Sequence, residues 1–541
     1  MIFHLQTWEA AVIALTCPAR VWGPAVLGTA VLLQGSAWAQ SGLPLSQSHW
    51  PNQTAIGPQG TPPSQSVFYA SYPYVAPPGH PIQGPAQDVV TSDDLLKRLE
   101  HAEQQIRELE AASAAADLSG AKKELETKSE SKKDDGKKDE SKKDSSKDSK
   151  SGEKKKSWYE KYTIRGYGQI RINEVLDDDG GNAPAHYVAD SSVGDNQSFI
   201  IRRARLILSG DVNEHVGIYL QPDFASGVPG VGDAIQFAQI RDWYSDLYLD
   251  TDKIHRLRIG QSKVPYGWEN MQSSSNRLPL DRNDALNSAV RNERDLGVFY
   301  YWTPTFAQKF FKDVVDEGLK GSGNYGVFGL GVYNGQGGSF REQNDNLHVV
   351  ARLAIPGCLP NGQRYEVAMQ GYTGRYVVLT SPISPLGVGP AVAPTNFADG
   401  FTDERLAWTL VYYPQPLGFQ AEWTTGRGPS LNAAQTAIEE QDLEGGYVQT
   451  MYQIKNCYGT WFPFSRYSHY RGGYKPERNS PYSEVDEWEL GLEWQMNSAA
   501  ELVTMYTLTD RTNTTARSTA NTLSYGQFEG SLLRFQFQFN Y

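Results

Sequence analysis

The segment SLLRFQFQFNY, residues 531–541, alternates between two kinds of side chain: from Leu533 to Tyr541 every second residue is apolar or aromatic, and the residues between them are polar or charged. Side chains of an extended strand point alternately to opposite sides, so this segment has one apolar and one polar face. In a soluble sheet, a bare terminal strand of this kind favours aggregation. A transmembrane β-barrel needs the pattern, because one face meets lipid and the other a wet lumen. The segment therefore predicts a membrane barrel, with a soluble β-sandwich as the alternative.

Composition is consistent with the barrel. The chain has 541 residues and a formal net charge of −12, and no segment after the N-terminus has the eighteen or so apolar residues that a membrane helix needs. If the protein lies in a membrane, it must cross with strands.

The N-terminus has the features of a secretory signal peptide. The apolar residues 21–33 follow Arg20, and the small-residue motif Ala37-Trp38-Ala39 precedes Gln40. This order fits export and cleavage, so residues 1–39 are predicted to be a signal peptide; an uncleaved anchor helix is the alternative.

Three segments of different composition follow. Residues 40–90 are rich in Pro, Gln and Ser and predict a linker. Residues 91–118 place Leu95, Leu99, Ile106 and Leu109 at heptad positions, which predicts a short coiled coil, or else a single amphipathic helix. Residues 119–157 consist mainly of Lys, Glu, Asp and Ser, which predicts a solvated, low-complexity tether. Because acids interrupt its lysines, no nucleic-acid partner is expected.

Residues 158–541 show repeated alternation of apolar and polar side chains, typical of barrel strands. We expect an all-β transmembrane barrel of about sixteen antiparallel strands, mostly of roughly 9–11 residues. The candidate strands are 163–173, 199–209, 214–224, 236–249, 255–262, 293–302, 325–333, 347–355, 364–376, 404–413, 417–425, 446–455, 458–467, 484–496, 499–508 and 529–541.

Short and long connections alternate between these strands, as in outer-membrane barrels with short periplasmic turns and long outer loops. The one exception is 303–324, which is long where a short turn is due. An even strand number would place the N-terminal segments in the periplasm. Aromatic residues near the strand ends predict an interfacial girdle, with ordinary core packing as the alternative; they are Trp243, Trp302, Tyr412, Tyr413, Trp423, Trp488 and Trp494.

Four segments resemble the phosphate-selective porin O and P family: RGYGQIRI (165–172), FIIRRARLILSGDVNEHVGIYLQPDF (199–224), LRIGQSKVPYGWENMQSSS (257–275) and NERDLGVFYYW (292–302). The resemblance extends from about Trp158 to Tyr541 and is strongest in the first half. It implies a sixteen-stranded, trimeric outer-membrane barrel whose best-known relatives line the pore with arginines and a lysine cluster for phosphate. It also implies that the loop after Gln261 folds inward and narrows the channel.

An anion pore needs fixed positive charge on its wet wall. Alternation places a set of basic residues on the lumen face, since an outward position would cost about 2–4 kcal/mol each at mid-membrane. The expected anion pathway is Arg165, Arg171, Arg203, Arg205, Arg256, Arg258 and Lys263, and the inward loop adds Arg277, Arg282 and Arg291 at the constriction. The alternative is that these side chains pair with lumen acids and only brace the barrel.

The late strands point acids inward. These are Glu422, Glu487, Glu489, Glu493 and Glu501. Early strands would then form a basic wall and late strands an acidic one, which departs from a uniformly anion-attracting pore. No dense lysine cluster matches that of the family.

The sequence therefore predicts an outer-membrane porin, a homotrimer, for passive diffusion of small hydrophilic solutes with a bias toward anions, phosphate among them. The alternatives are a weakly selective diffusion porin, or a structural anchor whose coiled coil links to the cell wall. No enzyme, cofactor or metal site is expected: His255, His348 and His469 lie in no catalytic motif, and the chain has no phosphate-binding GxxxxGK[ST] motif.

Overall fold

The computed structural model describes residues 158–177, 183, 185, 187, 188, 190, 192–194, 199–227, 236–385, 389–513 and 526–541, together with Gln104. The signal peptide, linker, coiled coil and tether predicted for residues 1–157 lie, apart from that one residue, outside the described residues. Within the described part, no helix has the length and hydropathy of a membrane span.

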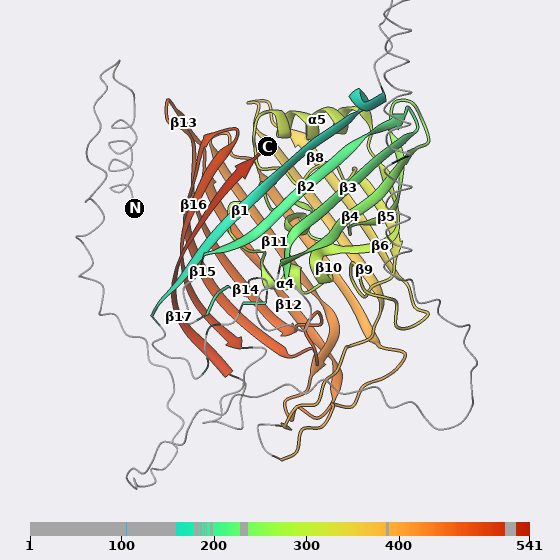
Figure 1. Cartoon of the computed structure of the whole chain (residues 1–541), viewed down its shortest axis with the longest axis vertical. Helices are drawn as coiled ribbons and strands as arrows, with labels where there is room; N and C mark the ends of the chain where they lie inside the picture. Colours follow the sequence, from blue (N-terminus) through green and yellow to red (C-terminus); the bar gives the residue numbers. More distant parts are fainter. Residues whose placement is uncertain are drawn as a thin grey trace, which may run out of the picture. The chain divides into compact units, whose positions relative to one another are not determined.

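The described strands form one closed antiparallel sheet (Figure 1). Each strand pairs with its sequence neighbours, and β17 closes the ring by pairing with β1. Strands β12 and β13 both pair with β14, on successive parts of it, and so form one broken barrel strand. Seventeen labelled strands therefore make the sixteen-stranded barrel that the sequence predicted.

Most strands are longer than the predicted ones, because polar residues continue the ladder beyond the apolar band. The strands are β1 (Tyr162–Asp177), β2 (Ile200–Asn213), β3 (Val216–Gly227), β4 (Gln236–Tyr248), β5 (His255–Lys263), β6 (Arg294–Trp302), β7 (Phe328–Tyr333), β8 (His348–Cys358), β9 (Arg364–Tyr376), β10 (Phe401–Tyr412), β11 (Leu417–Leu431), β12 (Ile438–Tyr452), β13 (Ile454–Asn456), β14 (Gly459–Gly473), β15 (Tyr482–Asn497), β16 (Ala500–Asn513) and β17 (Gly526–Asn540). The helices are η1 (Trp158–Lys161), α3 (Trp268–Met271), α4 (Asp284–Asn287), η2 (Arg291–Glu293) and α5 (Thr305–Asp316).

In strand β17, apolar side chains lie on the outer face of the barrel and polar side chains on the inner face. Phe537 and Phe539 are 39% and 41% exposed on the outer face, whereas Arg534 and Gln538 on the inner face are at most 1% exposed. The outer rings lie across glycines of β1: a Cβ on Gly168 would come within 2.3 Å of the Phe539 ring. Small residues on one strand thus make room for aromatic rings on the other, and the closing seam is packed on its lipid side.

The short connections gather at one end of the barrel, here called the turn end, and the long ones at the other, the loop end. The turn-end connections are residues 214–215, 249–254, 303–327, 359–363, 413–416, 457–458 and 498–499. The exception in the predicted alternation, 303–324, is explained by α5, a twelve-residue helix across the turn end (Figure 1).

One girdle assignment was wrong. Trp243, Trp423 and Trp488 are exposed on the outer face, as predicted, but Tyr413 is only 1% exposed. Its ring packs edge-on against Phe310 of α5, with centroids 5.9 Å apart. Tyr413 therefore belongs to the interior packing beneath α5, which the sequence pattern alone could not separate from the girdle.

Candidate functional site: the constriction

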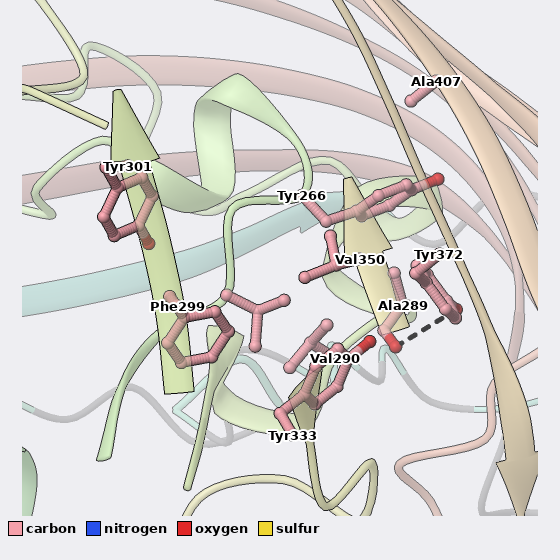
Figure 2. Close-up of a cluster of buried hydrophobic side chains, with 10 residues drawn as sticks. Tyr266, Ala289, Val290, Phe299, Tyr301, Tyr333, Val350, Tyr372 and Ala407 are labelled. Carbon is pink, nitrogen blue, oxygen red and sulfur yellow. Dashed lines mark hydrogen bonds between the residues drawn. The ribbon is translucent and has the colours of Figure 1, made fainter. Parts of the chain in front are cut away.

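The loop between β5 and β6, residues 264–293, folds into the barrel, as the resemblance implied. It carries α3, α4 and η2, and most of its side chains are buried. Tyr266, Ala289 and Val290 of the loop pack against inner-wall residues of β6 to β10 (Figure 2); these are Phe299, Tyr301, Tyr333, Val350, Tyr372 and Ala407. Apolar contacts therefore hold the loop against the wall formed by β6 to β10.

Glu422 on β11 fixes the start of α3. Its two carboxylate oxygens accept the backbone N–H groups of Trp268 and Glu269, at 2.6 and 2.8 Å. Tyr447 and Thr409 donate to the same carboxylate at 3.0 Å each. A negative group at a helix start satisfies amides that have no partner within the helix, so Glu422 acts as an external cap.

We expect Glu422→Ala to loosen this anchor at a cost of about 3 kcal/mol, because two charge-assisted bonds to buried amides are lost. The measurement is the urea midpoint of the barrel folded in detergent, together with open-channel current noise. Glu440→Ala, at an exposed glutamate of β12 that accepts the Thr402 amide, is the matched control.

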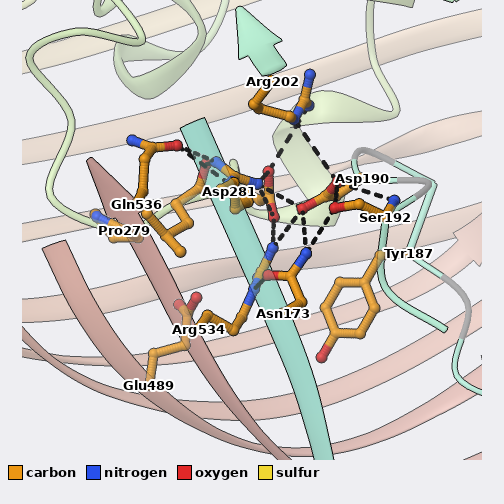
Figure 3. Close-up of polar contacts among 12 residues, drawn as sticks. Asn173, Tyr187, Asp190, Ser192, Arg202, Pro279, Asp281, Glu489, Arg534 and Gln536 are labelled. Atoms are coloured by element: carbon orange, nitrogen blue, oxygen red, sulfur yellow. Dashed lines mark hydrogen bonds and ion pairs between the residues drawn. The ribbon is translucent and has the colours of Figure 1, made fainter. Parts of the chain in front are cut away.

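A second anchor joins two inward segments to β1 and β17. Arg171 contacts Asp190 at 2.5 Å and Asp281 at 3.1 Å, and Arg534 contacts Asp190 at 2.8 Å and also pairs with Asp281 (Figure 3). The two arginines keep the pKa of both carboxyls below the usual range, even though burial opposes this. These four side chains bring two charges of each sign together.

A third anchor lies on β14. Arg466 contacts Glu269 of the loop at 2.8 Å and also pairs with Glu489 of β15, and all three side chains are buried. Its guanidinium further donates to the carbonyl of Asp281 at 3.1 Å. One arginine therefore joins an acid of the wall to an acid of the loop, and its single positive charge offsets one of their two negative charges.

The predicted basic residues fall into two groups. Five of them pair with acids, as the bracing alternative required: Arg171 with Asp190 and Asp281, Arg205 with Asp223, Arg256 and Arg258 with Asp246, and Arg282 with Glu293. These five side chains neutralise lumen acids and stabilise the wall.

The other five have no acidic side chain within 4.0 Å among the described residues, and bond only to neutral groups. Arg165 donates to the Ser209 hydroxyl, Arg203 to Gln169, Lys263 to the carbonyls of Met271 and Gln272, Arg277 to those of Pro279 and Leu280, and Arg291 to that of Pro476. These five charges are the uncompensated part of the predicted pathway.

Arg203 on β2 and Arg277 on the inward loop lie within electrostatic range of each other. Arg203 donates to Gln169 at 2.7 Å, and Gln169 donates to the carbonyl of Ser274 on the loop at 3.1 Å. Both guanidinium groups keep a buried nitrogen without a hydrogen-bond partner in the described structure, Nε of Arg203 and Nη1 of Arg277. Burial and the positive charge of Arg282 lower the pKa of Arg277 to about 9. The pair thus presents donors and positive charge in excess.

The acids of the late strands are mostly engaged. Glu422 caps α3, Glu489 pairs with Arg466, Glu493 pairs with Lys320, and Glu487 pairs with Arg511 at 3.2 Å. The inward placement predicted for these acids is correct. Glu422, Glu487 and Glu493 each bind a segment that enters the lumen, through Trp268, Tyr187 and Lys320 respectively. Glu489 pairs with a wall arginine, so these four acids do not form an open acidic wall.

Arg202 also reaches the cluster around Asp190 and Asp281, although the sequence pattern did not predict it as a site residue. The ladder between β1 and β2 shifts between Gln169–Arg203 and Ile170–Ile201, which leaves Arg202 as an extra residue in β2. Its side chain lies 3.7 Å from Asp190 and 3.9 Å from Asp281 (Figure 3). Strict alternation would turn Arg202 toward lipid, and nothing in the sequence marks the bulge. Arg466 and Arg534 were missed as site residues because their partners are distant in sequence.

A family model described as phosphate-selective porin O and P matches residues 185–541. No curated protein matches the chain. Among solved structures, the chain is similar to OmpT of Vibrio cholerae (12% identity, 70% of this chain and 97% of that chain, TM-score 0.41). It is also similar to the outer membrane channel DcaP of Acinetobacter baumannii (12%, 70% and 97%, TM-score 0.43). An anion-selective porin from Comamonas acidovorans matches at 10% identity over 70% of this chain and 99% of that chain, with a TM-score of 0.41.

Proposed function

The chain belongs to the phosphate-selective porin O and P family of outer-membrane porins, and we propose that its pore favours small anions over cations. Solutes cross by passive diffusion, driven by their own gradients. The constriction between β2 and the inward loop is where the choice between anions and cations is made.

The observation that carries this proposal is that Arg203 and Arg277 bond only to neutral groups, with no acidic side chain within 4.0 Å among the described residues. A guanidinium group without an acidic partner attracts a passing anion and repels a cation. Arginine suits this role, because its planar fork of donors matches the oxygens of phosphate and carboxylate. Arg202 and Arg205 also lie within electrostatic range of Arg203, but both have acidic partners, so the charge of Arg203 itself carries the argument.

Charge pairing in the rest of the lumen supports the same proposal. Most late-strand acids are neutralised by basic residues or bound to backbone amides, so they contribute little free negative charge. The transverse field expected from a basic early wall and an acidic late wall is therefore weakened. What remains is an excess of positive charge on the early wall and on the inward loop.

The test is the reversal potential of the wild-type protein in a planar bilayer across a potassium chloride gradient. We expect the sign of the reversal potential to show that chloride is more permeable than potassium. In a potassium phosphate gradient, we expect its sign to show that phosphate is more permeable than potassium. A cation-selective pore contradicts the proposal. Equal selectivity for chloride and phosphate would assign a general anion bias and argue against phosphate preference.

We also propose a homotrimer whose turn end faces the periplasm, as the family resemblance implies, with residues 40–157 on that side. A link to the cell wall through residues 91–118 would make the barrel an anchor as well as a channel. Removal of residues 40–157 leaves conductance unchanged if this region is a tether. Mass measurement of the detergent-solubilised protein gives the number of subunits.

A further inference from the structure

The connection between β6 and β7 contains a helix that covers part of the turn end of the barrel. Its helix α5 lies across the turn end and buries Ala307, Phe311 and Val314. At one end Gln308 donates to the carbonyl of Asp252, and near the other end Glu317 pairs with Arg364. The helix is therefore tied to two different turns and spans part of the barrel opening.

After α5 the chain enters the lumen. Lys320 is 2% exposed and forms an ion pair with Glu493 of β15. Its backbone has a positive φ of 63°, a conformation that lysine seldom adopts without surrounding contacts to hold it. Because residues 303–327 start and end on neighbouring strands β6 and β7, a contact with β15 means that this connection reaches far across the lumen.

The segment also meets the inward loop. Gln272 donates to the carbonyl of Lys320 at 2.6 Å, and Asn276 donates to that of Gly321 at 2.8 Å. Trp268 and Met271 of α3 belong to the same buried cluster as the apolar face of α5. The lumen is therefore narrowed from both ends, and the two inserted segments support each other.

An open cavity of about 350 Å³ remains beside the inserted segment. One side is lined by Val314, Val315 and Leu319, and the other by Arg165, Tyr167 and Ile207 of the barrel wall. Arg165 is exposed and bonds to the Ser209 hydroxyl at 2.8 Å; among the described residues no acidic side chain lies within ion-pair distance of it. The guanidinium group of Arg165 therefore lies in the lining of this cavity.

We propose that residues 305–323 form a plug that sets the size limit of the pore at the turn end, with Lys320 as its positioning residue and Arg165 as the charged residue of the remaining opening. The inference rests on the proposed porin function. It assigns size exclusion and charge selection at this end to two different residues, so the two properties are separable by mutation.

The experiment measures which neutral polymers, added on the turn side of a planar bilayer, enter the pore and reduce its conductance. Two variants disturb the plug: Lys320→Met, which leaves the buried Glu493 carboxylate without its cation, and replacement of residues 305–322 by Asn-Gly, which removes the segment. We expect both to admit larger polymers from the turn side and to conduct severalfold more than wild type. Lys312→Met, at an exposed lysine of α5 that pairs with Asp316, is the matched control and keeps the wild-type limit.

Arg165→Gln gives the opposite pattern: the polymer limit stays that of wild type, and the reversal potential moves toward cations.

A second measurement, the rate of cysteine labelling, does not depend on conductance. A cysteine placed by Glu501→Cys, with the other cysteines replaced by serine, is expected to react severalfold faster with a bulky maleimide when the plug is removed. An unchanged polymer limit or an unchanged labelling rate in both plug variants overturns the proposal. A wild-type barrel that conducts no ions contradicts the porin function instead, and the labelling rate still tests the plug.

Discussion

The double variant Arg203→Gln/Arg277→Gln is expected to abolish the anion preference of the pore, moving the reversal potential in a salt gradient to zero or to the cation side. At an effective dielectric constant near 20, one positive charge about 4 Å from a permeating anion contributes about 4 kcal/mol of attraction. Both side chains are buried at the constriction and have no acidic partner among the described residues, so this attraction is not cancelled locally. Each single variant should produce a smaller shift of the same sign.

The control for this experiment is Arg471→Gln, at an exposed arginine that bonds to Tyr482. Its loss removes one positive charge, as each single variant does, but none from the constriction, so the reversal potential should remain that of wild type. An unmoved potential in the double variant would show that ions do not pass these two arginines. Far-ultraviolet circular dichroism confirms that each variant keeps its strands.

The second large effect concerns stability: Arg466→Met should destabilise the barrel by about 3–5 kcal/mol, because it leaves two buried carboxylates, Glu269 and Glu489, without their cation. The loop loses one of the three polar anchors described above at the same time. The measurement is the urea midpoint of the detergent-folded protein, followed by tryptophan fluorescence and converted with a common m-value.

Arg427→Met provides the comparison within the same protein. Arg427 contacts Asp442 at 3.4 Å, but the two side chains are 53% and 88% exposed. Exposed ion pairs contribute about 0–1 kcal/mol, so this variant should unfold near the wild-type midpoint. Equal midpoints for the two variants would mean that the Arg466 cluster has no net role in stability.

The barrel was predictable because its main determinant is local. Period-two alternation assigns each side chain to lipid or lumen without any knowledge of partners, and Phe537 and Arg534 lie on the faces expected from it. The alternation of long and short connections was equally local. Its exception at 303–324 was visible in the sequence, but the sequence did not show that α5 lies there or that Tyr413 packs beneath it.

The pairing of charges was not predictable, because it depends on contacts between residues far apart in sequence. Arg466 and Glu269 are 197 positions apart, and Arg534 and Asp190 are 344 apart. Alternation could place each of these strand arginines inside the barrel. It could not show whether an acidic side chain lies within ion-pair distance of each one. For this reason the sequence could not show which five of the ten predicted basic residues pair with acids, and that division needed three-dimensional structure.

The bulge at Arg202 also has an evolutionary consequence. Arg202 is one extra residue in β2, and Ile201 and Arg203 on either side of it keep the pairings that an unbroken strand would give them. A gene that loses this single codon would still encode a strand with its lipid-facing and lumen-facing residues in order. Insertions and deletions are normally excluded from barrel strands, since they exchange the two faces. Aligned relatives should therefore tolerate a one-residue gap at position 202, and lineages could gain or lose a pore arginine there without rebuilding the strand.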